Sequence, residues 1–386
     1  RGLNPESVAS GLNVHTVLLS DLSDSTANYQ RLVLGFEDIN RQWGGDHDFN
    51  DVVMVVHVVP ATAPYATQSP LANLQSLTTL PQSGPLADTD GDGVPDIADA
   101  YPNDPTRAYV NVYPSASGWG TLAFEDLWPS RGDYDLNDVV VHYRTTEVLN
   151  AARQVVALTV DHEFLARGGT IETGYGLHLP GVARTAVAST QLTVGGQTVT
   201  GAGPEAGQTE AVFIVAPRLS ALLPSGNGGC VQVNTIDGCP RVPLVTARLQ
   251  VTFATPQAAS LFSAPYNPFI HTGGVRGREV HLPGRPPTAL ADPSLFGTAD
   301  DRTVAGSSFT YMDADRRPWA LDIPSDWTWP KELLDVMNPY PAFGDWALSG
   351  GSRSRDWYSS SRRSEEHTSE LQSRLHLVCR LLLEKK

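Results

Sequence analysis

The chain has 386 residues, and its 42 acidic residues against 27 basic residues give a formal net charge of −15. This balance disfavours nucleic acid or an anionic membrane as a partner, and it favours cation binding or simple solubility. A hydrophobic fraction of 41% can fill real cores and argues against wholesale disorder. No apolar stretch approaches the roughly 20 residues of a membrane-spanning helix, so we expect no transmembrane segment in this chain.

Short runs of β-branched residues recur along the sequence, for example VVMVVHVV and TARLQVTFA, and turn residues bound them. Such runs are typical of strands. The 34 glycines and 29 prolines indicate many short connections. We therefore predict a mainly β protein, with two β-sandwich (jelly-roll-like) domains joined by a Pro-rich linker and a calcium-binding loop.

Residues 1–60 contain strand-like runs, and we interpret them as the C-terminal part of a truncated β domain. The chain starts at Arg1 rather than Met, so we expect the original N-terminus, with any signal or anchor, to be missing. Residues 61–87 contain four prolines and no charged side chain. They predict a semi-extended linker.

Residues 88–105 begin with the acidic motif DTDGDGVPDIAD. Counted from Asp88, carboxylates stand at positions 1, 3, 5, 9 and 12 and a glycine at position 6, as in a twelve-residue Ca²⁺ loop. Oxygen donors without His or Cys favour Ca²⁺ over a softer metal. The alternative is a solvated acidic linker. The predicted ligands are the carboxylates of Asp88, Asp90, Asp92, Asp96 and Asp99 and the backbone carbonyl of Val94.

Prolines around this motif argue against the flanking helices that an EF-hand requires, since Pro95 lies inside it and Pro102 and Pro105 follow it. The stretch DTDGDGVPDIADAYPNDP instead resembles a thrombospondin type 3 repeat. That resemblance implies Ca²⁺ ions that hold together a linker without a core of its own. The cysteine usual in such repeats is absent.

A second acidic pattern occurs twice, in residues 36–56 and 124–143: Phe-Glu-Asp, then Gly-Asp-x-Asp-x-Asn-Asp-Val-Val. Asp-x-Asp-x-Asn is the first half of a Ca²⁺ loop, but position 6 lacks glycine, so another element must complete the coordination. The upstream Glu-Asp pairs are natural candidates. The alternative is that Asp and Asn only cap turns. The predicted ligands are Glu37, Asp38, Asp46, Asp48, Asn50 and Asp51 in the first copy, and Glu125, Asp126, Asp133, Asp135, Asn137 and Asp138 in the second.

The valines that follow this pattern place it relative to a strand. A continuous strand through residues 133–141 would put Asp133 and Asp135 on the same face as Val139. Carboxylates and valines seldom share a buried face, so we expect the Asp-x-Asp-x-Asn segment in a loop at the edge of the strand.

Residues 106–358 read as strands and turns throughout and predict one β-sandwich domain. Near its end, residues 331–351 predict two short helices separated by Pro339 and Pro341. Cys230 and Cys239 bracket a hairpin-like segment, which favours a local disulfide and an oxidising compartment. The alternative is two unpaired thiols.

Residues 359–386 form a tail, and from Arg363 onward its composition changes abruptly to helix formers without Gly or Pro. Residues 363–373 also match one reading frame of a widely used sequencing adapter. We interpret residues 363–386 as an artefact and exclude them from the fold. The alternative is a short amphipathic helix.

Several motifs together resemble the LruC domain of bacterial envelope and secreted proteins. They are FEDLWPSRGDYDLNDVVVHY, GYGLHLPG, NPFI, REVHLPGRPPT, SLFGT, PWALDIP and the closing SGG…DWY, in this order over about residues 109–358. Residues 1–60 look like the end of a second domain of unknown function that often precedes it. The family has no established activity. Its association with leptospiral surface antigens implies a protein outside the cell or in the outer envelope of a bacterium.

Two residue groups raise other functions. Glu279 and His281 would share a strand face with His271 nearby, but no nucleophile elbow, HExxH or phosphate loop accompanies them, so we predict no enzyme and keep a hydrolase as the least favoured alternative. Trp327 and Trp329 lie in a Trp-rich region and could contact a glycan, unless they are core residues.

The predicted function is that of a non-enzymatic calcium-binding protein of the cell envelope or exterior, with a structural or adhesive role. The expected partners are Ca²⁺ ions, with surface glycans or other envelope proteins as further candidates. A carbohydrate-binding module is the alternative.

Overall fold

The computed structural model describes residues 16–21, 30–36, 52–58, 76–77, 87–96, 98–226, 229–304 and 306–359. The chain divides into two compact units, residues 1–108 and 109–386. The first acidic copy (Glu37, Asp38, Asp46, Asp48, Asn50 and Asp51) and the tail from residue 363 lie outside the described residues. In the part of the chain described, no helix has the length and apolar character needed to cross a membrane.

The first unit contains a sheet in the order β3-β2-β1-β4. Its strands are β1 Thr16–Asp21, β2 Gln30–Phe36, β3 Val52–Val58 and β4 Ser76–Leu77. The first three pair antiparallel, whereas β4 runs parallel to β1. Since β4 falls within residues 61–87, part of the predicted linker is a short strand. Residues 87–96 and 98–108 form turns without a helix, as the prolines there predict.

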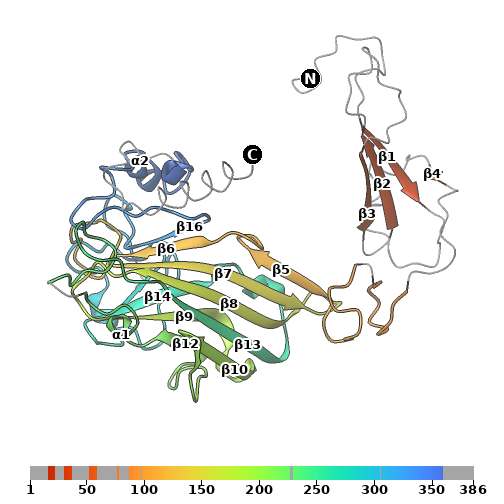
Figure 1. Cartoon of the computed structure of the whole chain (residues 1–386), viewed down its shortest axis with the longest axis horizontal. Coiled ribbons are helices and arrows are strands. Elements are labelled where there is room, and N and C mark those ends of the chain that lie inside the picture. The colour runs from red at the N-terminus through yellow and green to blue at the C-terminus, as the bar shows by residue number, and fades with distance from the viewer. Residues whose placement is uncertain are drawn as a thin grey trace, which may run out of the picture. The chain divides into compact units, whose positions relative to one another are not determined.

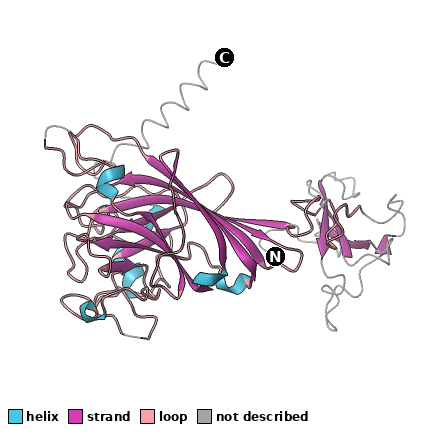
Figure 2. Ribbon diagram, turned by 90° about the horizontal axis from the view of Figure 1, so that it is seen from below, coloured by secondary structure: helices cyan, strands magenta, loops and turns pink. Residues whose placement is uncertain are grey.

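The second unit is a sandwich of two sheets (Figures 1 and 2). The long sheet has the order β11-β10-β13-β8-β7-β6-β16, with β5 also pairing with β7. Its strands are β5 Tyr109–Tyr113, β6 Gly120–Phe124, β7 Val139–Leu149, β8 Val155–Ala166, β10 Val187–Val194, β11 Gln197–Thr198, β13 Val245–Gln257 and β16 Ala320–Ile323. The short sheet has the order β12-β9-β14-β15. It consists of β9 Thr173–Ala183, β12 Glu210–Ala216, β14 Asn267–Thr272 and β15 Glu279–His281.

The main core lies between these sheets. Val141, Val160 and Leu249 of the long sheet pack with Leu177 and Phe213 of the short sheet in one buried cluster. A second cluster lies where the C-terminal segment meets β6 and β16, and it includes Tyr134, Leu136, Leu321, Trp327, Trp329, Tyr340, Phe343 and Trp357. The predicted mainly β fold is confirmed.

Helices are few in the described residues: α1 Leu219–Leu222 and α2 Phe343–Leu348. Only the second of the two helices predicted in residues 331–351 forms. The first is replaced by turns, because its backbone amides bond elsewhere: that of Leu333 donates to Asp135 Oδ2 at 2.9 Å and that of Val336 to the carbonyl of Tyr134 at 2.9 Å.

Candidate metal centre

The second copy of the acidic pattern lies in the connection between β6, which ends at Phe124, and β7, which begins at Val139. Tyr134 and Leu136 adopt positive φ values of 62° and 55°, so this segment does not continue the strand. Its placement in a loop at the strand edge is therefore confirmed.

Three predicted ligands of this copy come together. Carboxylate oxygens of Glu125, Asp133 and Asp135 lie within 4.8 Å of one another. Glu125 and Asp135 are 0% and 1% exposed. Glu125 Oε1 accepts a hydrogen bond from the amide of Leu136 at 2.5 Å, whereas its Oε2 is buried without a partner. A buried carboxylate oxygen left unpaired in this way is costly unless a cation meets it.

Asp126, Asn137 and Asp138 continue the cluster. Asp138 Oδ2 accepts the amide of Asp126 at 2.8 Å, while Asp126 Oδ2 and Asn137 Oδ1 are buried without hydrogen-bond partners. The backbone of residues 168–169 passes close by. A Cβ atom would stand 1.8 Å from Asn137 Oδ1 at Gly168 and 2.1 Å from Asp126 Oδ2 at Gly169, so only glycine allows this approach.

Glu332 belongs to the same acidic group, although sequence reasoning missed it. The position that a Cβ of Gly168 would occupy is 2.9 Å from Glu332 Oε2, which also accepts a hydrogen bond from Thr235 Oγ1 at 3.0 Å. Burial and the charges of Asp133 and Asp126 outweigh that hydrogen bond and raise the pKa of Glu332 to about 7. No spacing signal could have found it, because it is far along the chain from the repeat.

Burial is also the main reason why the other carboxyl groups of the cluster resist ionisation. It raises the pKa of Asp135 to about 8 and that of Asp126 to about 6, and Asp133 adds repulsion in both cases. The pKa values of Glu125 and Asp138 are raised well above their ordinary range by burial and by the neighbouring carboxylates. A divalent cation would supply the missing positive charge. The carboxylate and amide oxygens suit a hard ion such as Ca²⁺.

The exposed loop that begins at Asp88 has a different architecture. Carboxylate oxygens of Asp88, Asp90 and Asp92 lie within 4.8 Å of one another. Asp88 accepts the amides of Gly91 at 2.8 Å and Gly93 at 3.1 Å, and both glycines have positive φ, 77° and 94°. The turn that brings these acids together therefore depends on the glycines.

The remaining acids of this loop differ in how free their oxygens are. Oδ2 atoms of Asp90, Asp92 and Asp99 are buried without partners. In contrast, both oxygens of Asp96 accept hydrogen bonds from Thr89, each at 2.7 Å. Asp96 therefore braces the loop. The side chain of Val94 is buried, and its amide donates to Asp92 Oδ1 at 2.7 Å.

Comparison with known proteins assigns the chain to a family. Residues 153–358, more than half of the chain, match the family described as "Domain of unknown function (DUF4842)". The chain belongs to the DUF4842 family. Residues 1–58 match a second family, "Domain of unknown function (DUF4114)". No curated protein matches the chain.

A solved structure shares the fold of this DUF4842 protein. It is the crystal structure of a "Putative lipoprotein from Bacteroides ovatus", with a TM-score of 0.54 and 16% sequence identity over 94% of this chain and 97% of that one. At this identity the likeness concerns the fold alone.

The predicted glycan contacts within the DUF4842 region are wrong. Trp327 and Trp329 are only 2% and 3% exposed. The ring of Trp327 packs against Tyr340 and Trp357, at 5.5 and 6.0 Å between centroids, and Trp329 Nε1 donates to the carbonyl of Asn234 at 3.1 Å. The C-terminal segment folds inward here, so these rings form core instead of surface.

Glu279 and His281 of the DUF4842 region are also buried, in a network whose polar atoms bond to one another. Glu279 Oε2 contacts His281 Nε2 at 2.8 Å, and His281 Nδ1 contacts Asn267 Oδ1 at 2.8 Å. Burial favours the neutral acid, but hydrogen bonds from His281 and Thr288 and the charge of Arg276 lower the pKa of Glu279 to about 2. This arrangement stabilises the short sheet.

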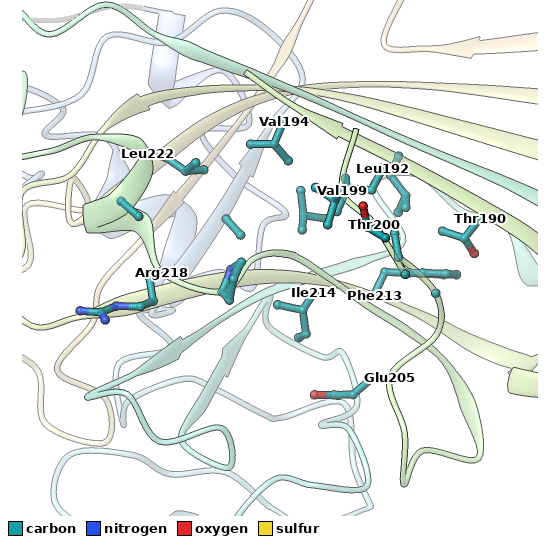
Figure 3. A pocket seen from close by; sticks show the side chains of 18 residues that line it. Thr190, Leu192, Val194, Val199, Thr200, Glu205, Phe213, Ile214, Arg218 and Leu222 are labelled. Atoms are coloured by element: carbon teal, nitrogen blue, oxygen red, sulfur yellow. The ribbon is translucent and has the colours of Figure 1, made fainter. Parts of the chain in front are cut away.

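An apolar pocket of about 620 Å³ opens between the edge strands β10 and β12 of the two sheets (Figure 3). Leu192, Val199 and Phe213 are among the side chains that line it. Its charged residues are already paired, Arg218 with Glu172 and Glu205 with Arg276.

The disulfide expected from the sequence is present in the DUF4842 region. Cys230 and Cys239 are bonded, with their Cα atoms 5.7 Å apart. It closes the segment next to Val233, whose amide donates to the carbonyl of Arg167 at 2.8 Å, directly before the glycines of the acidic cluster.

Proposed function

We propose that this protein is a non-enzymatic calcium-binding protein of the bacterial cell surface or exterior. In this role Ca²⁺ ions stabilise acidic loops of a β scaffold that has a structural or adhesive task. The observation that supports it most is the buried cluster of Glu125, Asp126, Asp133, Asp135, Asn137 and Asp138, in which three oxygen atoms have no hydrogen-bond partner.

Two features favour Ca²⁺ over a purely structural reading. Asp and Asn that only cap turns use their oxygens on backbone amides, which here leaves Glu125 Oε2, Asp126 Oδ2 and Asn137 Oδ1 unexplained. The second feature is the exposed loop, where Asp88, Asp90 and Asp92 stand at the first, third and fifth positions of a calcium loop. Its resemblance to a thrombospondin type 3 repeat supports the same ion.

The location outside the cytoplasm rests on other grounds. The Cys230–Cys239 disulfide suits an oxidising compartment. The Bacteroides ovatus neighbour is described as a lipoprotein, and the motifs of residues 109–358 resemble the LruC domain of envelope and secreted proteins. Calcium sites of extracellular modules work at ~10⁻⁴–10⁻³ M, a range that the calcium-poor cytoplasm does not reach.

The proposal is tested by equilibrium dialysis against calcium, combined with thermal melting. Calcium at 100 times its Kd should stabilise the folded protein by about 2.7 kcal/mol, and thus raise its Tm by about 5–10 °C. Chelator should reverse the shift, and Asp345→Asn, which changes an exposed acid paired with Arg353, should not alter it. A protein that retains no calcium at millimolar concentrations and melts identically with chelator would refute the proposal.

A further inference from the structure

We propose that the second unit binds a neutral oligosaccharide in a groove on the outer face of its long sheet, beside Trp119. The groove has a volume of about 470 Å³, within the range of ligand pockets. Six residues supply its functional groups: Trp119, Arg144, Asp161, Glu163, Arg248 and Gln250. The inference does not depend on calcium binding.

The floor of the groove is a row of cross-strand neighbours. Arg248 of β13 pairs with Asp161 of β8, and Asp161 pairs with Arg144 of β7. Arg248 Nε donates to Asp161 Oδ1 at 2.6 Å, and Arg144 NH2 lies 4.0 Å from Asp161 Oδ2. Donors and acceptors therefore alternate across three strands. A sugar hydroxyl both donates and accepts, so a row of this kind can bond consecutive hydroxyl groups.

Trp119, directly before β6, forms a wall of the groove. The guanidinium carbon of Arg144 lies 4.4 Å from the centroid of its ring, and the imidazole of His142 stacks on it at 6.0 Å. The indole is half-buried, so part of its apolar surface still meets the groove. Aromatic rings in such positions contact the apolar C–H surface of a sugar while polar groups bind its hydroxyls.

The polar groups of the groove are fixed in advance. Arg144 NH1 also donates to the carbonyl of Ala116 at 3.2 Å, and Glu163 Oε2 contacts His142 Nδ1 at 3.1 Å. Side chains that are already held lose less conformational entropy when a ligand binds. This arrangement distinguishes the groove from an ordinary exposed sheet face with mobile charges.

Charge indicates a neutral ligand. The two guanidinium groups of Arg144 and Arg248 face the two carboxylates of Asp161 and Glu163. The net charge of −15 would in addition repel an anionic polysaccharide at long range. The groove also answers the glycan hypothesis that Trp327 and Trp329 fail, because it places an aromatic ring and polar groups at the surface.

The test is an array of neutral oligosaccharides (cello-, manno-, xylo- and galacto-hexaoses) with oligogalacturonate as the anionic probe, followed by calorimetric titration, all with calcium in the buffer. The full chain should bind a neutral oligosaccharide, and Trp119→Ala and Arg248→Ala should each weaken binding at least tenfold. The matched control is Arg218→Ala. Arg248 and Arg218 have side chains 56% and 70% exposed and are both paired with an acid, but Arg218 lies outside the groove.

Arg248→Ala leaves Trp119 and its packing in place, so it remains informative if Trp119→Ala perturbs folding. Binding only of oligogalacturonate, no binding of any neutral hexaose, or equal losses in Arg248→Ala and Arg218→Ala would overturn the proposal. A failure of this kind, with calcium stabilisation intact, would leave the calcium proposal standing.

Discussion

At the scale of single residues, the second unit gathers carboxyl groups that repel one another and are shielded from water. Glu125 is the clearest example, because it is fully buried, one oxygen is bonded to the amide of Leu136 and the other has no partner. Such a group is tolerated when it is protonated or meets a cation. Replacement of the unpaired oxygen therefore separates these two situations.

Glu125→Gln should have opposite effects with and without calcium. The amide keeps an oxygen for the Leu136 hydrogen bond and can offer its NH₂ group to Asp133 and Asp135, whose oxygens lie within 4.8 Å. Without calcium we expect a gain in unfolding free energy of about 1 kcal/mol, because one buried acid is removed. With calcium the stabilisation of the wild type should be largely lost. Urea titrations with calcium and with chelator measure both effects, and a loss in both conditions would contradict the metal site.

His162 makes stability depend on pH. It is buried between Phe164 and Tyr175, and burial lowers its pKa to about 4 against an ordinary 6.5. The unfolded chain therefore binds more protons between these values, and stability falls as the pH drops through 6.5 and levels off below about 4. At pH 5 the loss due to this group is about 2 kcal/mol.

His162→Phe keeps a ring in the core and removes the titration. Urea unfolding at pH 7.5 and pH 5.0 should therefore show a smaller loss on acidification in the variant than in the wild type. Other titrating groups are common to both proteins and cancel in the difference. Equal losses would mean that His162 already carries its proton in the folded state.

At the scale of elements, the sequence predicts the strands and the loop between β6 and β7 well, because hydrophobic alternation and the conflict between Asp135 and Val139 are local. It also predicts that Glu125 joins Asp133, since the repeat has one obvious source of further oxygens. Glu332 and the approach of Gly168 depend on packing between distant segments, which no local pattern reveals. Trp327 shows the converse error, because composition cannot tell a surface ring from a core ring.

The apolar pocket between β10 and β12 gives a prediction about packing. Ala202 lies half-buried on its wall, against the main core. Ala202→Leu should place extra apolar atoms in this space and stabilise the protein by about 0.5–2 kcal/mol, as cavity-filling substitutions commonly do. Chemical denaturation measures the gain. Destabilisation by the added methylenes would show that the wall has no room for them.

At the scale of the whole molecule, the two acidic sites belong to different compact units, the exposed loop to residues 1–108 and the buried cluster to residues 109–386. The first unit is built on a sheet of four strands, of which β4 contributes only two residues. The second has an extensive core between two sheets. Units with separate cores generally unfold as separate cooperative transitions.

Calorimetry of the full chain in millimolar calcium should therefore resolve two transitions that respond to different substitutions. Asp92→Asn should lower only the transition of the first unit, since Asp92 Oδ2 is unpaired there while its Oδ1 bond to the Val94 amide survives the change. Glu125→Gln should lower only the transition of the second unit. If calcium instead bound at a site shared by the units, both substitutions would shift both transitions together. Independent shifts would place one calcium site in each unit, and chelator should abolish both differences.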